Sequence, residues 1–264
     1  MSEFVETSRG DRIAYDRYGD GPAVVFIAGA GIHRGIDPVT GPTAELLAER
    51  GLSAFVYDRL GRGESGAEGV LDLDRELASV AAMLEVAGGE AVLVGHSSGC
   101  SIALAAVDAG LPVHGLVLWE APIADVAGDS VEWAEEFERL LDAGRLEDAQ
   151  RWYMKDMPPE WLEAAASSPA WPQMYGAAGS MRSDAQSLRW AVTGDPAETF
   201  ARVRVPVLAL AGTSTFDEMV HSSQLIVDAI PGATQRRVAG ADHSWEPGPM
   251  AEVLVEFVEA VVPA

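Results

Sequence analysis

The chain has 264 residues, 48% of them hydrophobic and 22% charged, which suits one globular domain with room for an inserted subdomain. Acidic residues outnumber basic residues 41 to 18, and the formal net charge of −23 repels phosphate backbones and anionic lipid headgroups. Nucleic acid and membrane surfaces are therefore excluded as expected partners, and the single cysteine, Cys100, excludes an intramolecular disulfide.

The sequence carries no recognisable targeting or membrane-spanning segment. Its first residues lack the basic and apolar regions of a signal peptide, and no apolar stretch has the length needed to span a bilayer. We therefore expect a cytoplasmic protein whose partner is a small-molecule substrate. The oligomeric state is left open by the sequence.

The first part of the chain alternates short apolar runs with amphipathic stretches. Residues 4–15 alternate around Gly10 and Asp11 and predict a β-hairpin. Continuous apolar runs typical of buried strands follow at 23–28, 53–58 and 91–94. Helices are predicted at 43–50 and 73–87, with a further helix from Cys100 onward.

The last part of the chain shows the same alternation. Strands are predicted at 115–120, 205–211 and 236–238, and helices at 222–230 and 250–261. Strands that alternate with helices indicate an α/β fold, with a mostly parallel sheet and helices on both faces.

The interval between residues 121 and 200 interrupts this alternation. It reads as short helices separated by prolines, with candidates at 131–143 and 146–154, and it holds five of the seven tryptophans. We expect residues 1–120 and 201–264 to form the core domain. Residues 121–200 are then a helical cap, or lid, over the carboxyl-terminal edge of the sheet.

The pentapeptide Gly95-His96-Ser97-Ser98-Gly99 is a G-x-S-x-G motif between an apolar strand and a helix of small residues. Strand, sharp turn and helix are the context that a nucleophile elbow requires, because the serine hydroxyl is then exposed above a helix N-terminus. The two glycines are needed where backbone and helix approach closely. The motif therefore predicts that Ser97 is a catalytic nucleophile.

A serine nucleophile needs an oriented base, and His243 is the candidate. It lies in Gly240-Ala241-Asp242-His243, which we expect to be a loop between the last strand and the final helix. The other histidines have no matching context. The chain order of serine, acid and histidine agrees with the order found with this motif.

Together these segments resemble the α/β-hydrolase superfamily over nearly the whole chain. Besides the elbow and the segment around His243, the resemblance includes residues 24–31 and 57–65. It implies an eight-stranded sheet with a helical cap between strands six and seven. It also implies that the backbone amides of Ala30 and Ser98 form the oxyanion hole, although Ala28-Gly29 stands where the family usually has His-Gly.

The acid that orients His243 has two candidates. Relatives usually carry an aspartate after strand seven, but Thr215 occupies that slot, and Asp217 lies two residues further on. Glu120 ends strand six, where haloalkane dehalogenases place their acid, and a carboxylate at the end of a buried strand needs a partner such as an imidazole. We favour Glu120 and keep Asp217 as the alternative.

These residues predict a cofactor-independent serine hydrolase of an ester, lactone or thioester. No metal site is expected from one cysteine and scattered histidines, and the glycines near Gly31 do not form a dinucleotide fingerprint. Asp58 is expected to form a structural ion pair. Two alternatives stay open: a non-hydrolytic cyclase or lyase of secondary metabolism that uses His243 as a base, and a small-molecule binding protein on the same fold.

Overall fold

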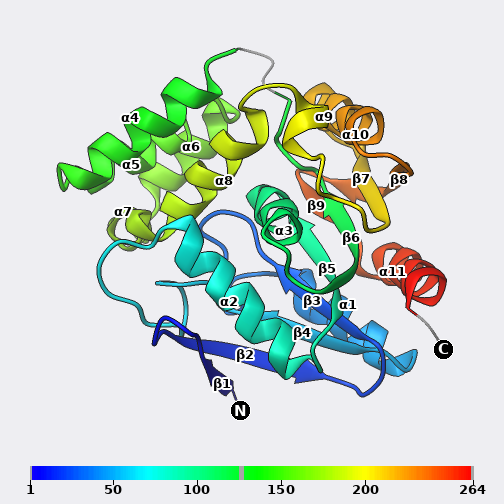
Figure 1. Ribbon diagram of the computed structural model, residues 1–264. Helices are drawn as coiled ribbons and strands as arrows, with labels where there is room; N and C mark the ends of the chain where they lie inside the picture. Colours follow the sequence, from blue (N-terminus) through cyan, green and yellow to red (C-terminus); the bar gives the residue numbers. More distant parts are fainter. Residues whose placement is uncertain (1, 125–127, 263–264) are drawn as a thin grey trace.

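The computed structural model describes residues 2–124 and 128–262, which fold into a three-layer α/β structure (Figure 1). One sheet has the strand order β1-β2-β4-β3-β5-β6-β7-β8-β9. The strands are β1 (Glu3–Glu6), β2 (Arg12–Tyr18), β3 (Ala23–Ile27), β4 (Ser53–Tyr57), β5 (Ala91–His96), β6 (Val113–Trp119), β7 (Val207–Ser214), β8 (Thr234–Ala241) and β9 (Ser244–Trp245).

The centre of the sheet is parallel and its edges are antiparallel. β4, β3, β5, β6, β7 and β8 pair in parallel, whereas β1 pairs with β2, β2 with β4, and β8 with β9 in antiparallel fashion. The described residues thus form nine strands rather than the expected eight. The extra strand is the two-residue β9, which is too short to leave a hydrophobic pattern in the sequence.

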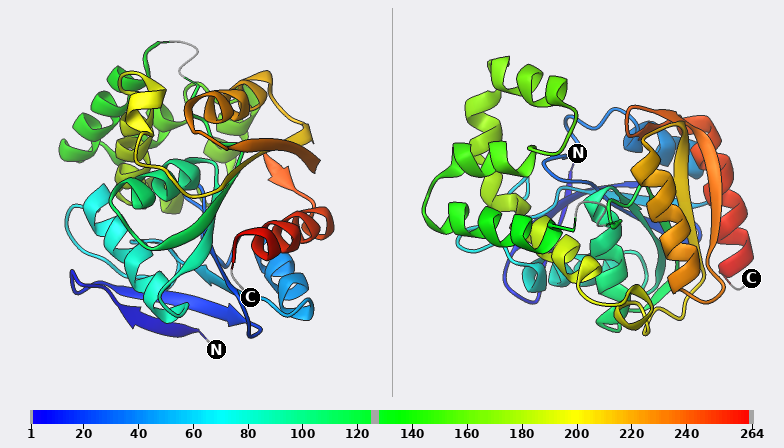
Figure 2. Two further views of the ribbon diagram at one scale, coloured as in Figure 1. Left: turned by 45° about the vertical axis from the view of Figure 1, so that its right-hand side comes forward. Right: turned by 90° about the horizontal axis from the view of Figure 1, so that it is seen from above.

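Helices cover both faces of the sheet because its central strands are apolar on both sides (Figure 2). One face packs against α2 (Leu73–Val86), α3 (Ser98–Asp108) and α10 (Asp217–Ala229). The other face packs against α1 (Thr40–Glu49) and α11 (Pro247–Val261). Among the helices of the described residues, none is both long and apolar enough to cross a membrane.

A run of helices separates β6 from β7 in the chain, and we call them the inserted helices (Figure 1). They are α4 (Ser130–Asp142), α5 (Leu146–Tyr153), α6 (Pro159–Ser167), α7 (Trp171–Gly176), η1 (Ala178–Met181), α8 (Arg182–Val192) and α9 (Pro196–Thr199). Part of this segment has its own small core, centred on Phe137 and Tyr153. α8 joins the segment to the main domain, since Ser187 shares a hydrogen bond of 2.8 Å with Ser101 of α3.

Two predicted elements differ from the structure in extent. α10 begins at Asp217, five residues before its predicted start at residue 222, and β8 is longer than predicted at both ends. Asp58 forms the structural ion pair expected of it; its partner is Arg34, with an Nη2–Oδ2 distance of 3.1 Å, rather than the adjacent Arg59. Arg59 instead turns toward α2 and α8.

Candidate active site

The elbow has the strained geometry that its sequence predicts. Ser97 connects β5 to α3 with φ 54° and ψ −127°, a conformation that a residue with a Cβ rarely adopts. The flanking glycines leave the space for it. A Cβ on Gly95 would lie 2.6 Å from Cα of Cys100, and one on Gly99 would lie 2.2 Å from the carbonyl oxygen of Ile27.

Ser97 lies against the ends of two neighbouring strands. Its amide donates to the carbonyl of Trp119 at the end of β6, with an N–O distance of 2.9 Å. On the other side, the ideal Cβ position of Gly29 is only 3.0 Å from Ser97 Cβ and 3.7 Å from its Oγ. The hydroxyl itself has no hydrogen-bond partner within residues 2–124 and 128–262, so it is free to meet a ligand.

His243 lies in the two-residue turn between β8 and β9, not in an open loop before the last helix as predicted. Asp242 and His243 have φ values of 51° and 65°, and Ala241 pairs with Ser244. Positive φ at both central positions is the signature of a type I′ hairpin turn, and Asp and His tolerate it better than most residues. The hairpin therefore fixes the backbone that carries the imidazole.

Two side chains hold this strained turn. His96 Nε2–H and Trp119 Nε1–H both donate to the carbonyl oxygen of His243, at 2.9 and 3.3 Å. The His96 and His243 rings lie 5.2 Å apart. Burial and the neighbouring His243 lower the pKa of His96 to about 4, so that His96 stays neutral and keeps its donor role at neutral pH.

Glu120 supports His243 from the end of β6. His243 Nδ1–H donates to Glu120 Oε2 at 2.6 Å, while Glu120 Oε1 accepts from the Gly212 amide at 2.8 Å. The carboxylate is 1% exposed. Burial alone would raise its pKa, but His243, the hydroxyl of Thr215 and the Gly212 amide lower it overall, so Glu120 stays ionised at neutral pH.

The structure brings Glu120 to the imidazole and leaves Asp217 away from it. Asp217 is exposed at the first position of α10, and its side chain makes no hydrogen bond or ion pair with any other described residue. Thr215 occupies the slot where relatives usually carry the acid, and its hydroxyl is buried without a hydrogen bond of normal geometry to any described residue. β6 and β7 run in parallel with Trp119 opposite Leu210, so the ends of the two strands lie side by side.

The amides of Ala30 and Ser98 lie on the two segments that meet at Ser97. Ser98 is the first residue of α3, where a helical amide has no partner within the helix. Ala30 follows Gly29, whose Cα faces the Ser97 side chain. In the part of the chain that the structure describes, neither amide donates to another group, so both remain available to an anion.

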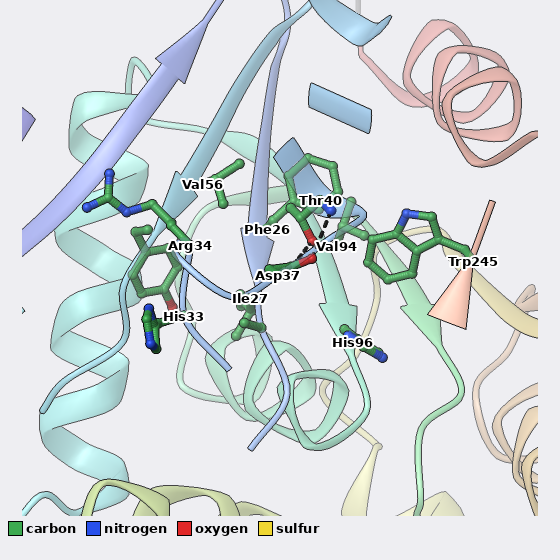
Figure 3. Close-up of a pocket in the computed structure, with 12 residues that line it drawn as sticks. Phe26, Ile27, His33, Arg34, Asp37, Thr40, Val56, Val94, His96 and Trp245 are labelled. Atoms are coloured by element: carbon green, nitrogen blue, oxygen red, sulfur yellow. Dashed lines mark hydrogen bonds between the residues drawn. The ribbon is translucent and has the colours of Figure 1, made fainter. Parts of the chain in front are cut away.

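A small cavity has Ala28, His96 and Trp245 among the residues that line it (Figure 3). Its volume of about 10 Å³ is close to the space of a single water molecule, so it is too small for a substrate. In the described chain, no three His, Cys, Asp or Glu side chains are grouped so that they could hold a metal ion. Cys100 is buried, and its Sγ contacts the Gly95 carbonyl at 3.2 Å.

Several residues around the site were not singled out from the sequence. Gly212 is one, because a Cβ there would lie 2.9 Å from Glu120 Oε1 and displace the carboxylate. Trp119 is another, as it donates to His243 from a strand that reads only as buried and apolar. Asp184, which accepts from the Ser98 hydroxyl at 2.6 Å, lies in α8 with no motif around it. Gly212 had a sequence signal, since a glycine inside a strand often marks a close approach.

The chain is similar to proteins of a known family and to several solved structures. The model of the alpha/beta hydrolase family matches residues 24–257. The crystal structure of an alpha/beta hydrolase from Sphaerobacter thermophilus is 32% identical, with a TM-score of 0.80 over 97% of this chain and 99% of that one. An esterase from Exiguobacterium antarcticum is 18% identical, with a TM-score of 0.65 over 98% and 100% of the chains, and so shares the fold.

One curated relative is much longer than this chain. The polyketide synthase ThaQ of Burkholderia thailandensis is 29% identical over 261 residues, which cover 92% of this chain. The chain spans only 12% of the length of that relative. The similarity therefore concerns one part of a large protein.

Proposed function

The chain belongs to the alpha/beta hydrolase family, and we propose that it is a hydrolase that cleaves a carboxylic ester, lactone or thioester through an acyl-enzyme on Ser97. In this proposal His243 is the general base and Glu120 orients it. The amides of Ala30 and Ser98 form the oxyanion hole. No metal or organic cofactor takes part in the reaction.

The observation that carries the proposal is the hydrogen bond of 2.6 Å from His243 Nδ1–H to Glu120 Oε2. A carboxylate can only accept, so the proton is on Nδ1 and the lone pair of the neutral imidazole is on Nε2. That is the tautomer a general base needs. The His243 ring packs 5.2 Å from the ring of the elbow residue His96, and the proposal requires this lone pair to reach Ser97 Oγ when substrate is bound.

The acylation step follows from these roles. His243 Nε2 removes the proton from Ser97 Oγ as Oγ bonds to the substrate carbonyl carbon, and the carbonyl oxygen becomes an oxyanion. Glu120 stabilises the imidazolium that forms. Collapse of the tetrahedral intermediate breaks the bond to the alkoxy or thiolate leaving group, which takes the proton from Nε2.

The oxyanion hole and deacylation complete the cycle. The Ala30 and Ser98 amides donate to the oxyanion, and a donor of this kind stabilises a transition state by about 2.7–4 kcal/mol. Water, deprotonated by His243, then attacks the acyl-enzyme. The second intermediate releases the carboxylic acid and returns the proton to Ser97.

The substrate class is inferred from the surroundings of the site. The inserted helices are rich in aromatic side chains, which favours a small, moderately apolar acyl or alcohol group. The net charge of −23 favours a neutral or cationic molecule. Thioesters belong among the test substrates because the chain is similar to part of a polyketide synthase.

Two other functions make different predictions for the same residues. A non-hydrolytic cyclase or lyase needs His243 as a base but no nucleophilic Ser97. A binding protein needs neither a strained serine nor an oriented imidazole. The buried Glu120 beside His243 favours the hydrolase over both, because its desolvation is justified by an imidazole that becomes charged during turnover.

A substrate panel tests the proposal. The purified protein is assayed with p-nitrophenyl esters of increasing acyl length, aliphatic lactones and S-acyl-N-acetylcysteamine thioesters, with products identified by mass. We expect hydrolysis in at least one class and a fall in kcat of about 10⁶-fold, or to background, in Ser97→Ala. Ser223→Ala is the matched control, because this buried hydroxyl bonds only the Met219 carbonyl of its own helix. Turnover that survives in Ser97→Ala would exclude the acyl-enzyme.

A further inference from the structure

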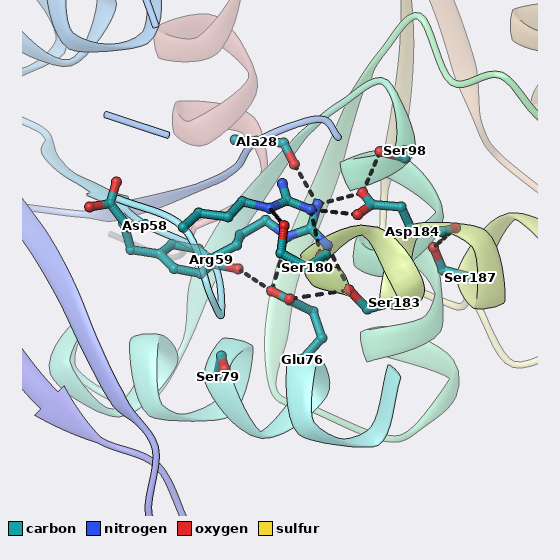
Figure 4. A network of polar contacts seen from close by, with 12 residues as sticks. Ala28, Asp58, Arg59, Glu76, Ser79, Ser98, Ser180, Ser183, Asp184 and Ser187 are labelled. Atoms are coloured by element: carbon teal, nitrogen blue, oxygen red, sulfur yellow. Dashed lines mark hydrogen bonds and ion pairs between the residues drawn. The ribbon is translucent and has the colours of Figure 1, made fainter. Parts of the chain in front are cut away.

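A group of four buried charges lies directly behind the elbow (Figure 4). We call it the four-charge network: Arg59, Arg62, Glu76 and Asp184. Arg59 Nη1 and Arg62 Nη2 contact the two oxygens of Asp184 at 2.6 and 2.5 Å, and Arg59 Nε lies 3.1 Å from Glu76 Oε1. No side chain of the network is more than 2% exposed, and two positive charges balance two negative ones.

The network reaches the backbone on both sides of Ser97. Arg62 Nη1–H donates to the Gly29 carbonyl at 2.7 Å, and Arg59 Nη1–H donates to the Ala28 carbonyl at 3.0 Å. From the elbow, the Ser98 hydroxyl donates to Asp184 Oδ1 at 2.6 Å. The network therefore contacts both segments that supply the proposed oxyanion donors.

The bond to the Gly29 carbonyl determines where the Ala30 amide points. The two groups belong to one peptide unit, and in a planar trans peptide N–H and C=O point in opposite directions. By holding the carbonyl, Arg62 turns the N–H away from itself. The Ile32 amide also donates to this carbonyl at 3.4 Å, in a turn where Gly31 has φ 70°, so Gly31 permits a conformation that Arg62 then fixes.

We propose that Arg62 and Asp184 are positioning residues of the oxyanion hole: Arg62 sets the direction of the Ala30 amide, and Asp184 ties the elbow at Ser98 to the same guanidinium. This inference rests on the proposed function. A flip of the Gly29–Ala30 peptide would leave a buried guanidinium N–H without its acceptor, which is unfavourable because a buried donor without a partner has lost its hydration. Because Asp184 belongs to α8, docking of the inserted helices completes the hole.

All three nitrogens of the Arg62 guanidinium are engaged. Besides Gly29 and Asp184, it donates from Nη2 to the Ser180 carbonyl at 2.9 Å and from Nε to the Ser180 hydroxyl at 3.3 Å. A lysine would keep the positive charge beside Asp184. It could not hold the Gly29 carbonyl, Ser180 and Asp184 together, because its single nitrogen lacks the planar fork.

The test is Arg62→Lys, measured on an ester that the wild type hydrolyses. We expect kcat to fall by about 10²-fold, the effect of losing one oxyanion donor, with KM little changed. The Ki of a boronic acid, whose tetrahedral adduct on Ser97 places an oxygen in the hole, should rise in parallel with the fall in kcat. The inflection of the pH–rate profile should stay at the wild-type pH, because Glu120 and His243 are untouched.

Arg75→Lys is the matched control. Arg75 is 20% exposed, more than Arg62, but it is likewise an arginine in an ion pair, with Asp11, and it donates to the carbonyls of Glu68 and Val70 at 2.7 and 2.8 Å. It has no contact with the elbow among the described residues. Arg75→Lys should lower the melting temperature and leave kcat and Ki at wild-type values, which separates a loss of stability from a loss of positioning.

The outcomes distinguish this inference from the proposed function. A folded wild type that neither hydrolyses any ester nor binds the boronic acid would overturn both. An active wild type with unchanged kcat and Ki in Arg62→Lys would overturn the positioning role alone. If Arg62→Lys does not fold, Ser98→Ala decides, since it removes only the hydroxyl on Asp184: a smaller parallel change in kcat and Ki supports the proposal, and no change refutes it.

Discussion

Two groups of buried charges lie next to the elbow, and they are built from different residues. The pair of Glu120 and His243 is 1% and 19% exposed, so the imidazole has a face open to a ligand. The four-charge network is sealed on all sides and relies on guanidinium groups. Histidine changes its protonation near neutral pH, whereas arginine does not lose its proton in proteins.

This difference implies a catalytic role for the pair and a structural role for the network. In the proposed mechanism the Glu120–His243 pair passes a proton to and from the substrate, so its effect is measured as a reaction rate. In the network, burial alone would raise the pKa of the Asp184 carboxyl, but Arg59 and Arg62 lower it, so its charges stay fixed. We therefore expect substitutions in the pair to affect kcat and substitutions in the network to affect stability and the shape of the hole.

The largest expected effect is that of Glu120→Gln. The amide retains the shape of the side chain but neither stabilises the imidazolium nor enforces the proton on Nδ1, so kcat/KM should fall by about 10⁴-fold. The melting temperature should change little. Steady-state kinetics and a thermal scan check this, with Asp217→Asn as the control that keeps wild-type rates. A loss with Asp217→Asn and none with Glu120→Gln would reverse the assignment of the acid.

Asp184→Ala should have the next largest effect, and this effect should be on stability rather than on the reaction rate. Removing this carboxylate leaves Arg59 and Arg62 buried without their shared counter-charge, which should reduce the free energy of unfolding by about 3–5 kcal/mol. Urea unfolding of wild type and variant measures it. Arg182→Ala, which breaks the more exposed pairs with Glu138 and Asp142, is the comparison and should reduce the free energy of unfolding much less. Equal losses in the two variants would show that the network is no more than a surface ion pair.

The smallest expected effect is a loss of stability at acid pH that is caused by the titration of His96. Its pKa is about 4 in the folded protein against an ordinary 6.5, so between these values only the unfolded chain binds the proton. The free energy of unfolding therefore falls as the pH drops from 6.5 to 4, by up to about 3 kcal/mol at about 1.36 kcal/mol per pKa unit.

His96→Gln isolates this contribution. Glutamine can supply an N–H to the His243 carbonyl but does not titrate. Urea unfolding at pH 7 and at pH 4.5 should show a larger drop for the wild type than for His96→Gln, because the carboxylates contribute equally to both. Identical drops would mean that His96 is protonated as readily in the folded protein as in the unfolded chain.

The pair was predictable from sequence and the network was not. Ser97 has a motif, and Glu120 ends a buried strand, so the rules for parallel sheets bring both to one edge where His243 can reach them. Asp184 stands 86 residues from Ser98, in a helix whose pattern indicates only amphipathic packing. Nothing local marks a carboxylate that will be buried by two distant arginines.

The secondary structure was also predictable only in part. Continuous apolar runs predicted the central strands, because burial on both faces leaves that pattern. The hairpin of β8 and β9 was missed because Asp242-His243 lacks the glycine that usually marks a type I′ turn. The partner of Asp58 also could not be predicted from the sequence, because Arg34 lies on a loop whose path depends on tertiary packing.

The most direct test of the account is the intact mass of the protein after treatment with a fluorophosphonate, for wild type and Ser97→Ala. Such a probe reacts with a serine that a base has activated and whose oxyanion is stabilised. We predict one adduct on the wild type and none on Ser97→Ala. An unmodified wild type that is folded, or an adduct that persists in the variant, would contradict the assignment of Ser97 as the nucleophile.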